Sequence, residues 1–327
     1  MPETALEIVR SNLAEHPAVL AWNRLQRLAV EPSEIVVLKK RIKSTVYRLA
    51  DAGPGGSAII AKYCRRPVAL HERIVYGELL CKLPVATPHF YGTVPGDEEF
   101  DWLFLECLHG EQYSRQSAEH SRLAAEWLGL LHRSSAVIAE SLSLPDRGPQ
   151  HYLRHLQSAH RRLAQALAVC NFRKEESMIV SGAMSQCMWL ESHWNELEKY
   201  SDRMPRTFVH GDFKPKNALV RRDSHSGAVF TSYDWEMSGW GVPAVDLAHV
   251  DIVAYHSVLK ELWSGVQVED LKQLALIGKI FRRLAAFDWE SEKFDPRWEI
   301  AMEHMNLYKA DMAGLIQVLC GSNHASA

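Results

Sequence analysis

Hydrophobic residues are spaced differently in the first third of the chain and in the remainder. Within residues 5–30 they recur at helical intervals, interrupted by Pro17, which predicts one or two amphipathic helices. Short apolar runs bounded by turn residues then predict about five strands, over 35–38, 45–49, 57–63, 89–94 and 101–107. A helix over 68–83, ending before Pro84, is expected between the third and the fourth of these strands.

From residue 117 onward the pattern is mainly helical. Leu123, Trp127 and Leu131 follow one another at intervals of four, so we expect them on one face of a helix. Similar patterns predict helices over 150–169 and 175–200, and again toward the end of the chain. Residues 207–235 interrupt this pattern with three short apolar runs. A polar turn separates the last two runs, which predicts a hairpin inside the helical part.

These elements predict an α+β protein with two lobes. The first lobe is expected over residues 1–107, rich in strands and preceded by the N-terminal helical segment. The second is expected over 108–327 and is helical. A chain of 327 residues suits two domains at about 150 residues per domain. Hydrophobic residues make up 47% of the chain, enough to build packed cores, which argues against an intrinsically disordered protein.

Charge and cysteine content exclude several other classes of protein. The formal net charge is −3, whereas a dedicated nucleic-acid binder normally carries a basic excess, so no nucleic-acid partner is expected. No apolar stretch approaches the length of roughly 20 residues that spans a bilayer, so no membrane association is expected. The six cysteines form no CxxC pair, and the N-terminus lacks the basic and apolar pattern of a secretory signal. We therefore expect a cytoplasmic protein, and nothing in the sequence specifies its oligomeric state.

The most informative segment begins with His210, Gly211 and Asp212. Asn217 follows Asp212 by five positions, and Asp234 follows Asn217 by seventeen, at the end of the hairpin. Two carboxylates and one amide are thus expected at one end of the hairpin. Mg²⁺ prefers such oxygen ligands together with phosphate oxygens, and a further carboxylate can accept a proton from a hydroxyl group. These are the groups that phosphoryl transfer needs.

The segment resembles the aminoglycoside phosphotransferase and choline kinase group, which shares the two-lobed protein-kinase fold. The kinase motif His-Arg-Asp-x₄-Asn has the same spacing from aspartate to asparagine, with arginine at the position of Gly211. The stretch 240–248, Trp-Gly-Val-Pro-Ala-Val-Asp-Leu-Ala, is also similar to that group. The resemblance implies that Asp212 is the catalytic carboxylate and that Asn217 and Asp234 hold Mg²⁺ on the nucleotide. It also implies that Asp246 braces the catalytic loop.

The first lobe should then supply a phosphate-binding lysine and a glutamate that pairs with it. Lys62, in the run Ile-Ile-Ala-Lys-Tyr, has the position of that lysine. Glu72 is the preferred partner from the expected helix, and Glu78 is the alternative. Glu106 is in the segment that resembles the hinge between the lobes, whose backbone would bind adenine.

One loop departs from the kinase pattern. The segment 39–44, which is expected to join the first two strands, contains four basic residues and no glycine. Kinases cover the nucleotide phosphates with a glycine-rich loop at this point. Backbone amides, the Ser44 hydroxyl and the basic side chains are candidates for contacting the phosphates instead, and a solvated turn is the alternative interpretation of the basic run.

The resemblance implies an ATP-dependent phosphotransferase, with GTP as the other nucleotide, that acts on a hydroxyl of a small molecule. An aminoglycoside-type antibiotic or a related metabolite is the expected acceptor, and choline, sugar, homoserine and macrolide acceptors remain alternatives. The acidic and aromatic segment 288–303 is a candidate for binding the amines of such a drug, and a charged surface is the alternative interpretation. The missing glycines also leave open a pseudokinase that binds nucleotide without catalysis.

Overall fold

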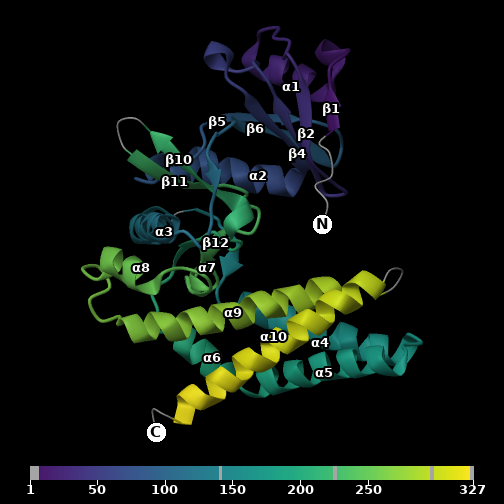
Figure 1. The fold of residues 1–327 in the computed structure, drawn as a ribbon, viewed down its shortest axis with the longest axis vertical. Coiled ribbons are helices and arrows are strands. Elements are labelled where there is room, and N and C mark those ends of the chain that lie inside the picture. Colours follow the sequence, from purple (N-terminus) through teal and green to yellow (C-terminus); the bar gives the residue numbers. More distant parts are fainter. Residues whose placement is uncertain (1–6, 140–141, 224–226, 295–297, 325–327) are drawn as a thin grey trace. The chain divides into compact units, whose positions relative to one another are not determined.

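The computed structural model describes residues 7–139, 142–223, 227–294 and 298–324. The chain forms two compact units, and each contains two segments of sequence (Figure 1). The first unit contains residues 1–114 and 215–236, and the second contains residues 115–214 and 237–327. A single boundary after residue 107 was expected. The hairpin segment 215–236 instead groups with the N-terminal residues, because one of its strands pairs with a strand there.

The first unit contains a six-stranded antiparallel sheet in the order β1-β2-β3-β4-β6-β5. Its strands are β1 (Glu7–Val9), β2 (Ile35–Arg41), β3 (Ser44–Leu49), β4 (Ile59–Arg65), β5 (Phe90–Pro95) and β6 (Phe100–Glu106). Five of them match the strands predicted from the sequence, and β1 was expected to be helical. The strand forms there because Glu7–Val9 pairs with β2, which would otherwise be an unpaired edge.

Two predicted boundaries in this unit were also wrong. The segment 39–44 is not a loop, because β2 continues to Arg41 and β3 begins at Ser44, so only Ile42 and Lys43 form the turn. The helix expected over 68–83 ends early: α2 (Arg66–Ile74) is followed by a π-helical turn, Val75–Leu79, and a 3₁₀ turn, Leu80–Lys82. Gly77 and the β-branched pair Ile74–Val75 have low helix propensity, which explains the irregular end.

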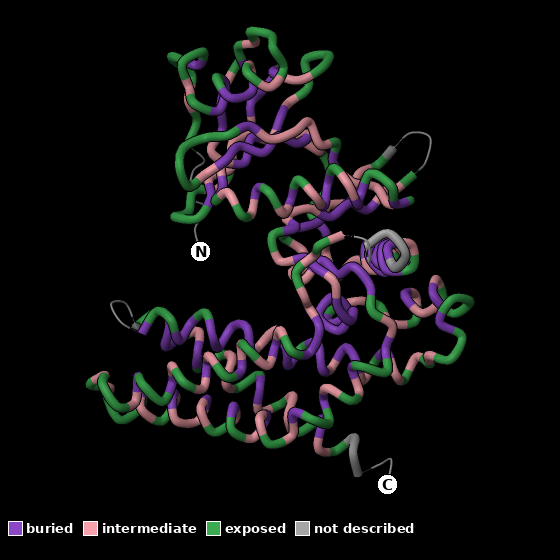
Figure 2. The backbone as a smooth tube through the Cα atoms, turned by 180° about the vertical axis from the view of Figure 1, so that it is seen from behind, coloured by how far each residue is buried: buried purple, intermediate pink, exposed green. Residues whose placement is uncertain are grey.

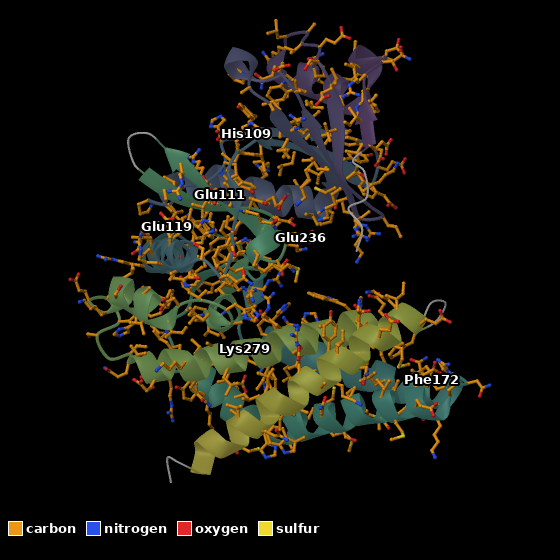
Figure 3. The ribbon with its side chains drawn as sticks, viewed as in Figure 1. His109, Glu111, Glu119, Phe172, Glu236 and Lys279 are labelled. Atoms are coloured by element: carbon orange, nitrogen blue, oxygen red, sulfur yellow. The ribbon has the colours of Figure 1, made fainter. Side chains whose placement is uncertain are left out.

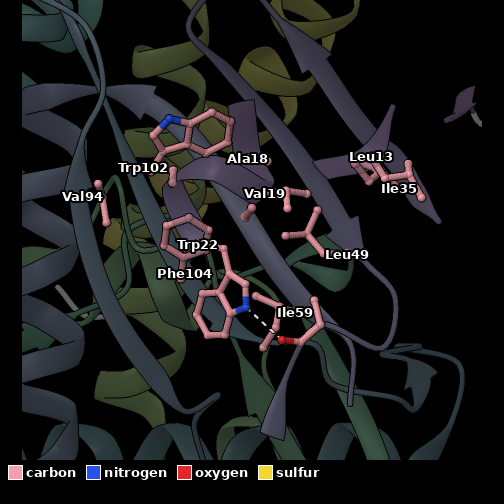
Figure 4. Packing of buried hydrophobic residues seen from close by; sticks show 13 residues of the cluster. Leu13, Ala18, Val19, Trp22, Ile35, Leu49, Ile59, Val94, Trp102 and Phe104 are labelled. Carbon is pink, nitrogen blue, oxygen red and sulfur yellow. Dashed lines mark hydrogen bonds between the residues drawn. The ribbon is translucent and has the colours of Figure 1, made fainter. Parts of the chain in front are cut away.

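One face of the six-stranded sheet packs against α1 (Pro17–Gln26). Trp22 lies at the centre of this core, where its Nε1 donates a hydrogen bond of 2.8 Å to the Ala52 carbonyl (Figure 4). The sheet contributes buried side chains such as Ile59, Ala61 and Phe104. Because side chains alternate along a strand, Ile60 and Lys62 of β4 point to the opposite face. Because Ile59 and Ala61 are buried in the core with α1, Ile60 and Lys62 are the residues of β4 whose side chains are available to a ligand.

A second, smaller sheet of the first unit has the order β11-β10-β7. Its strands are β7 (Glu111–Gln112), β10 (Ala218–Asp223) and β11 (Gly227–Ser232). The predicted hairpin is therefore confirmed, with Ala218 opposite Ser232. At its open end, the Tyr233 amide donates to the Asn217 carbonyl at 2.9 Å. This bond holds Asn217 beside the residues that follow β11.

The second unit is mainly helical. Its helices are α3 (Ala118–Ala139), α4 (Pro149–Val169), α5 (Lys174–Ser192), α6 (Trp194–Ser201), α7 (Ala244–Leu247), α8 (Ile252–Leu259), α9 (Val268–Ser291) and α10 (Trp298–His324). The helix expected over 175–200 is divided into α5 and α6 at His193. A small sheet of the order β8-β12-β9 also belongs to this unit, with strands Asp146–Arg147, Gly239–Gly241 and Thr207–Val209.

Buried positions recur along the helices of the second unit at intervals of three and four residues (Figure 2). Leu271, Leu274, Phe281 and Leu284 of α9 are fully buried, and this helix packs against α4, α7 and α10. Among the described residues, none of the helices combines the length and the hydropathy that a membrane crossing requires.

Candidate active site

A cavity of about 770 Å³ lies in the first unit. Part of its wall is apolar and part is charged. The apolar side chains include Leu38, Val46, Ile60, Leu105 and Leu219, and the charged or polar ones include Lys39, Arg41, Lys62, Glu72, Asn217 and Asp234. A cavity with an apolar part and a few converging polar groups suits a ligand with a flat apolar end and a charged end.

Lys62 is the buried cation at the charged end of this cavity. Its Nζ donates to both Glu72 oxygens, at 3.0 and 2.9 Å, and to Asp234 Oδ1 at 2.8 Å. Burial alone would lower the pKa of the ammonium group, but the two carboxylates outweigh burial and raise the pKa well above its ordinary value. Lys62 therefore stays protonated and presents a fixed positive charge.

Glu72, and not Glu78, is the partner of Lys62. Glu72 is 1% exposed on α2, whereas Glu78 lies on the surface near Arg73, at 3.9 Å. Glu72 Oε1 also accepts a hydrogen bond of 2.8 Å from the Trp235 amide. This single carboxylate therefore ties together β4, α2 and the backbone next to Asp234, and it holds the lysine in place.

Replacing Glu72 by glutamine should weaken this arrangement. The substitution keeps the size of the side chain but leaves the buried Lys62 with one carboxylate fewer, and breaking a buried ion pair typically costs about 3–5 kcal/mol. We expect Glu72→Gln to lower the free energy of unfolding by about 2 kcal/mol or more, because the amide oxygen can still accept a hydrogen bond.

Chemical denaturation of Glu72→Gln and Glu78→Gln measures this effect. The exposed Glu78 is the matched control, for which we expect a change within about 0.5 kcal/mol. Equal effects of the two substitutions would show that the buried contact with Lys62 contributes little to the stability of the unit.

Asn217 and Asp234 lie at the open end of the β10–β11 hairpin, as the sequence predicted. Asn217 is 3% exposed and lines the cavity. Asp234 adopts a left-handed backbone conformation, with φ of 67°, which is uncommon for a residue other than glycine and often marks functional sites. Its second carboxylate oxygen lies 3.8 Å from Lys39 Nζ. Two lysines thus surround this carboxylate with positive charge.

The donors in this region suit a hard divalent cation. Asp234 and Asn217 offer carboxylate and amide oxygens, the ligand types that Mg²⁺ takes alongside phosphate oxygens and water. Within the described part of the chain, no group of three His, Cys, Asp or Glu side chains is arranged to hold a metal ion unaided. Asp234 and Asn217 would therefore share a cation with a phosphorylated ligand.

Ser44 occupies a different position from the one expected, whereas Glu106 lines the cavity. Ser44 is the first residue of β3, opposite Cys64, and it does not line the cavity, because the chain turns after β2 rather than at residue 39. Glu106 does line the cavity, but its side chain accepts a hydrogen bond from the His89 amide. The residues of the segment 39–44 that do line the cavity are Lys39 and Arg41.

Asp212 belongs to the second unit and lies between two cations. Its Oδ1 is 2.5 Å from Lys214 Nζ and 3.6 Å from Arg282 Nη2. Neither cation was among the site residues expected from the sequence. Lys214 follows Asp212 by two positions and could have been found from the motif. Arg282 lies 70 positions away on α9, and nothing local in the sequence points to it.

The loop that precedes Asp212 is braced by Asp246, which is 1% exposed on α7. Its carboxylate accepts hydrogen bonds from the His210 amide, at 2.7 Å, and the Gly211 amide, at 2.9 Å. His132 Nε2 lies 3.2 Å from the same carboxylate. Burial opposes ionisation of Asp246, but these hydrogen bonds hold its pKa below the ordinary value. The two residues before Asp212 are thus fixed by a buried anion.

Gly211 is required by both the backbone and the surrounding space. Its φ is +77°, and a Cβ atom at this position would lie 2.1 Å from the Met237 carbonyl oxygen. Gly227 has the same φ, but a Cβ atom there would meet nothing within 4 Å. The close approach of the Met237 carbonyl therefore leaves no room for a side chain, such as arginine, at the position before Asp212.

We expect Gly211→Ala to destabilise the protein by about 3 kcal/mol, against about 1 kcal/mol for Gly227→Ala. Both substitutions place alanine in a left-handed conformation, and only the first adds a clash with the backbone. Thermal unfolding of the two variants measures the difference. Equal losses would mean that the loop around Gly211 relaxes freely to admit a side chain.

Two carboxylates of the acidic segment 288–303, those of Asp288 and Glu290, pair with basic side chains within the second unit. Asp288 accepts hydrogen bonds from His155, at 2.8 Å, and Arg162, at 2.9 Å. Glu290 pairs with Lys293 at 2.9 Å and lies 3.2 Å from His304. These pairs favour the interpretation of a charged structural region over a set of carboxylates available for amines. Residues 295–297 of the segment are outside the described residues.

A known protein family matches most of this chain. The model of the phosphotransferase enzyme family matches residues 42–297. Among curated protein sequences, none matches this chain.

Several solved structures share the fold. The GDP complex of wild-type aminoglycoside 2'-phosphotransferase-IIIa has a TM-score of 0.63 at 12% identity, over 92% of this chain and 99% of that chain. Choline kinase from Cryptosporidium parvum Iowa II has a TM-score of 0.58 at 12% identity, over 88% and 90% of the two chains. Macrolide 2'-phosphotransferase from Brachybacterium faecium has a TM-score of 0.54 at 16% identity, over 83% and 90%. The chain thus has a two-lobed, protein-kinase-like α+β fold, as the sequence predicted.

Proposed function

Because this chain belongs to the phosphotransferase enzyme family, we propose that it transfers the γ-phosphate of ATP to a hydroxyl group of a small molecule. The observation that carries the proposal is the buried Lys62, held by Glu72 and Asp234 at the charged end of a cavity of about 770 Å³. A buried, permanently charged lysine is costly for a fold to keep, and a polyphosphate provides a reason for it.

The cavity suits a nucleotide in one orientation. The base would lie among Val46, Ile60, Leu105 and Leu219, and the phosphates would extend toward Lys62. The Glu106 and Cys107 amides already donate to the His89 and Ala58 carbonyls. The amide of Leu108, which also lines the cavity, is then the donor that an adenine ring would use. GTP is the alternative nucleotide.

Charge at the other end of the cavity would bind the phosphates. Lys62 offers a point charge, and Lys39 and Arg41 line the same cavity from the β2 strand. Asn217 and Asp234 would hold Mg²⁺, which when bound neutralises charge on the phosphate oxygens. Glu72 lines the cavity, but both of its oxygens already accept hydrogen bonds from Lys62, and one also accepts from the Trp235 amide. It fixes the position of Lys62 and of the backbone next to Asp234.

Asp212 would act on the acceptor. Its carboxylate accepts a hydrogen bond from the acceptor hydroxyl and orients the oxygen for attack on the γ-phosphorus. A bond forms between this oxygen and the γ-phosphorus, while the bond from the γ-phosphorus to the bridging oxygen breaks and ADP leaves. The hydroxyl proton passes to Asp212 and then to solvent. Asp246 keeps the loop before Asp212 in place throughout.

An assay that couples ADP release to a spectroscopic signal tests the proposal. The acceptors are aminoglycosides, macrolides, choline and small sugars, with homoserine added as a carboxylate-bearing alcohol. An aminoglycoside-type acceptor is the expectation from the sequence, and the other classes are the alternatives. Turnover with one class, above the rate of hydrolysis by water, supports the proposal. No turnover with any class, together with a thermal shift on addition of MgATP, would favour a pseudokinase that binds nucleotide without catalysis. No turnover and no thermal shift would contradict the proposal altogether.

A further inference from the structure

A group of basic side chains gathers in the second unit around His249, which follows α7. Arg115 precedes α3, and Lys279, Arg282 and Arg283 lie on α9. Desolvation lowers the pKa of His249, and repulsion from these four cations lowers it further, to about 4. We call Arg115, Lys279, Arg282 and Arg283 the basic cluster. Lys279 is labelled on α9 in Figure 3.

The basic cluster reaches the proposed catalytic carboxylate. Arg282 acts on His249 and also lies 3.6 Å from Asp212 Oδ1, so one side chain belongs to both groups. Lys214, 2.5 Å from the same oxygen, adds a further cation on the Asp212 side. Positive charge therefore extends from the position of the acceptor hydroxyl to His249.

Some of these positively charged groups do not pair with an acidic side chain in the described part of the chain. Arg283 is accounted for, because it pairs with Asp311 at 2.6 Å and lies over the Tyr308 ring. Lys279 is exposed and pairs with no acidic side chain among the described residues. Arg282 Nη1 is buried and has no hydrogen-bond partner there. The Arg282 side chain is 17% exposed, so an anionic ligand would reach the accessible part of its guanidinium group together with Lys279.

The charge pattern opposes a polycationic acceptor. A cationic group beside Asp212 would meet Lys214 and Arg282 at short range, and like charges at such distances repel each other. Of the carboxylates that could attract amines, Asp288 is engaged by Arg162 and His155, and one oxygen of Glu290 is engaged by Lys293.

We propose that the acceptor alcohol carries an anionic group, a carboxylate or a phosphate ester, which the basic cluster binds while the hydroxyl meets Asp212. This inference rests on the proposed function and specifies its substrate class. Lys279 and Arg282 provide the charge and the donors, and the His249 ring lies among them as a neutral neighbour. The inference replaces the aminoglycoside expectation with an acceptor of the opposite charge.

A binding measurement tests the inference independently of catalysis. The probe is inorganic phosphate, added to protein that is saturated with ADP and Mg²⁺, and the signal is the His249 ring resonance at neutral pH, assigned with His249→Gln. Sodium chloride of matched ionic strength is the reference. We expect phosphate to shift this resonance saturably and Lys279→Glu to weaken the binding of phosphate by about tenfold or more. Lys272→Glu, an exposed change of the same charge on the same helix, should leave it within about twofold.

Two further results decide the inference. In the ADP-release assay, alcohols with a carboxylate and alcohols with a phosphate ester are compared with their uncharged parents and with an aminoglycoside, which also separates the two anionic groups. We expect the higher kcat/KM for an anionic alcohol, and a rise in its KM in Lys279→Glu. The inference would be overturned if phosphate did not shift the His249 resonance, or if ADP and Mg²⁺ without phosphate produced the same shift. A higher kcat/KM for the aminoglycoside than for the anionic alcohols would also overturn it. Failure of ADP to bind would instead count against the proposed function, and His249 would still report on phosphate.

Discussion

Asp212→Ala is expected to lower kcat by roughly 10²-fold or more, the usual contribution of a positioned general base. The KM for ATP should change little, because Asp212 is not among the residues that line the cavity of the first unit. The substitution also leaves Lys214 and Arg282 without their shared carboxylate. Steady-state kinetics with the best acceptor of the ADP-release screen provides both constants.

Asp202→Ala is the control for this substitution, since it removes an exposed carboxylate from the end of α6 in the same unit. We expect it to retain wild-type kinetics. Circular dichroism and thermal unfolding establish that Asp212→Ala is folded. A folded Asp212→Ala protein that phosphorylates its acceptor at a rate near that of the wild type would exclude Asp212 as the catalytic carboxylate.

Asp234→Ala should abolish nucleotide-dependent metal binding and lower phosphoryl transfer by roughly 10²- to 10³-fold, as expected for the loss of one electrostatic contact at the reacting phosphate. The Asp234 carboxylate would be the charged metal ligand next to Asn217, and it also accepts a hydrogen bond from Lys62. Mn²⁺ is a suitable reporter, because its electron paramagnetic resonance signal distinguishes free from bound ion in the presence of ATP.

Asp51→Ala is a close control for Asp234→Ala. Asp51 also has a left-handed backbone conformation, with φ of 59° against 67° for Asp234, and it does not line the cavity. The cost of alanine in that conformation is therefore similar in both variants. If Asp51→Ala lost Mn²⁺ and ATP binding as fully as Asp234→Ala, the loss would reflect the backbone and not the carboxylate.

The local sequence was enough to locate the residues that lie close together in the chain or on one hairpin. Lys62 was singled out because the run Ile-Ile-Ala-Lys-Tyr resembles the kinase lysine motif, and the hairpin pattern placed Asn217 near Asp234. The choice between Glu72 and Glu78 needed the structure, because it depends on how α2 is rotated against β4 and on where the helix becomes irregular.

Contacts between distant segments escaped the sequence analysis. Arg282 reaches Asp212 from another helix, and β1 forms only because β2 offers it an edge. The segment 215–236 joins the first unit through the pairing of β10 with β7, two strands separated by about a hundred residues. Ser44 was misplaced for a local reason, since basic residues at the end of a strand resemble a loop in composition.

The most direct test is a crystal structure of the protein with Mg²⁺ and a non-hydrolysable ATP analogue. We expect the base among the apolar side chains of the cavity, phosphate oxygens within hydrogen-bonding distance of Lys62 Nζ, and a metal ion bound by oxygens of Asn217 and Asp234. A nucleotide bound at another place, or bound here with its phosphates directed away from Lys62, would contradict the account.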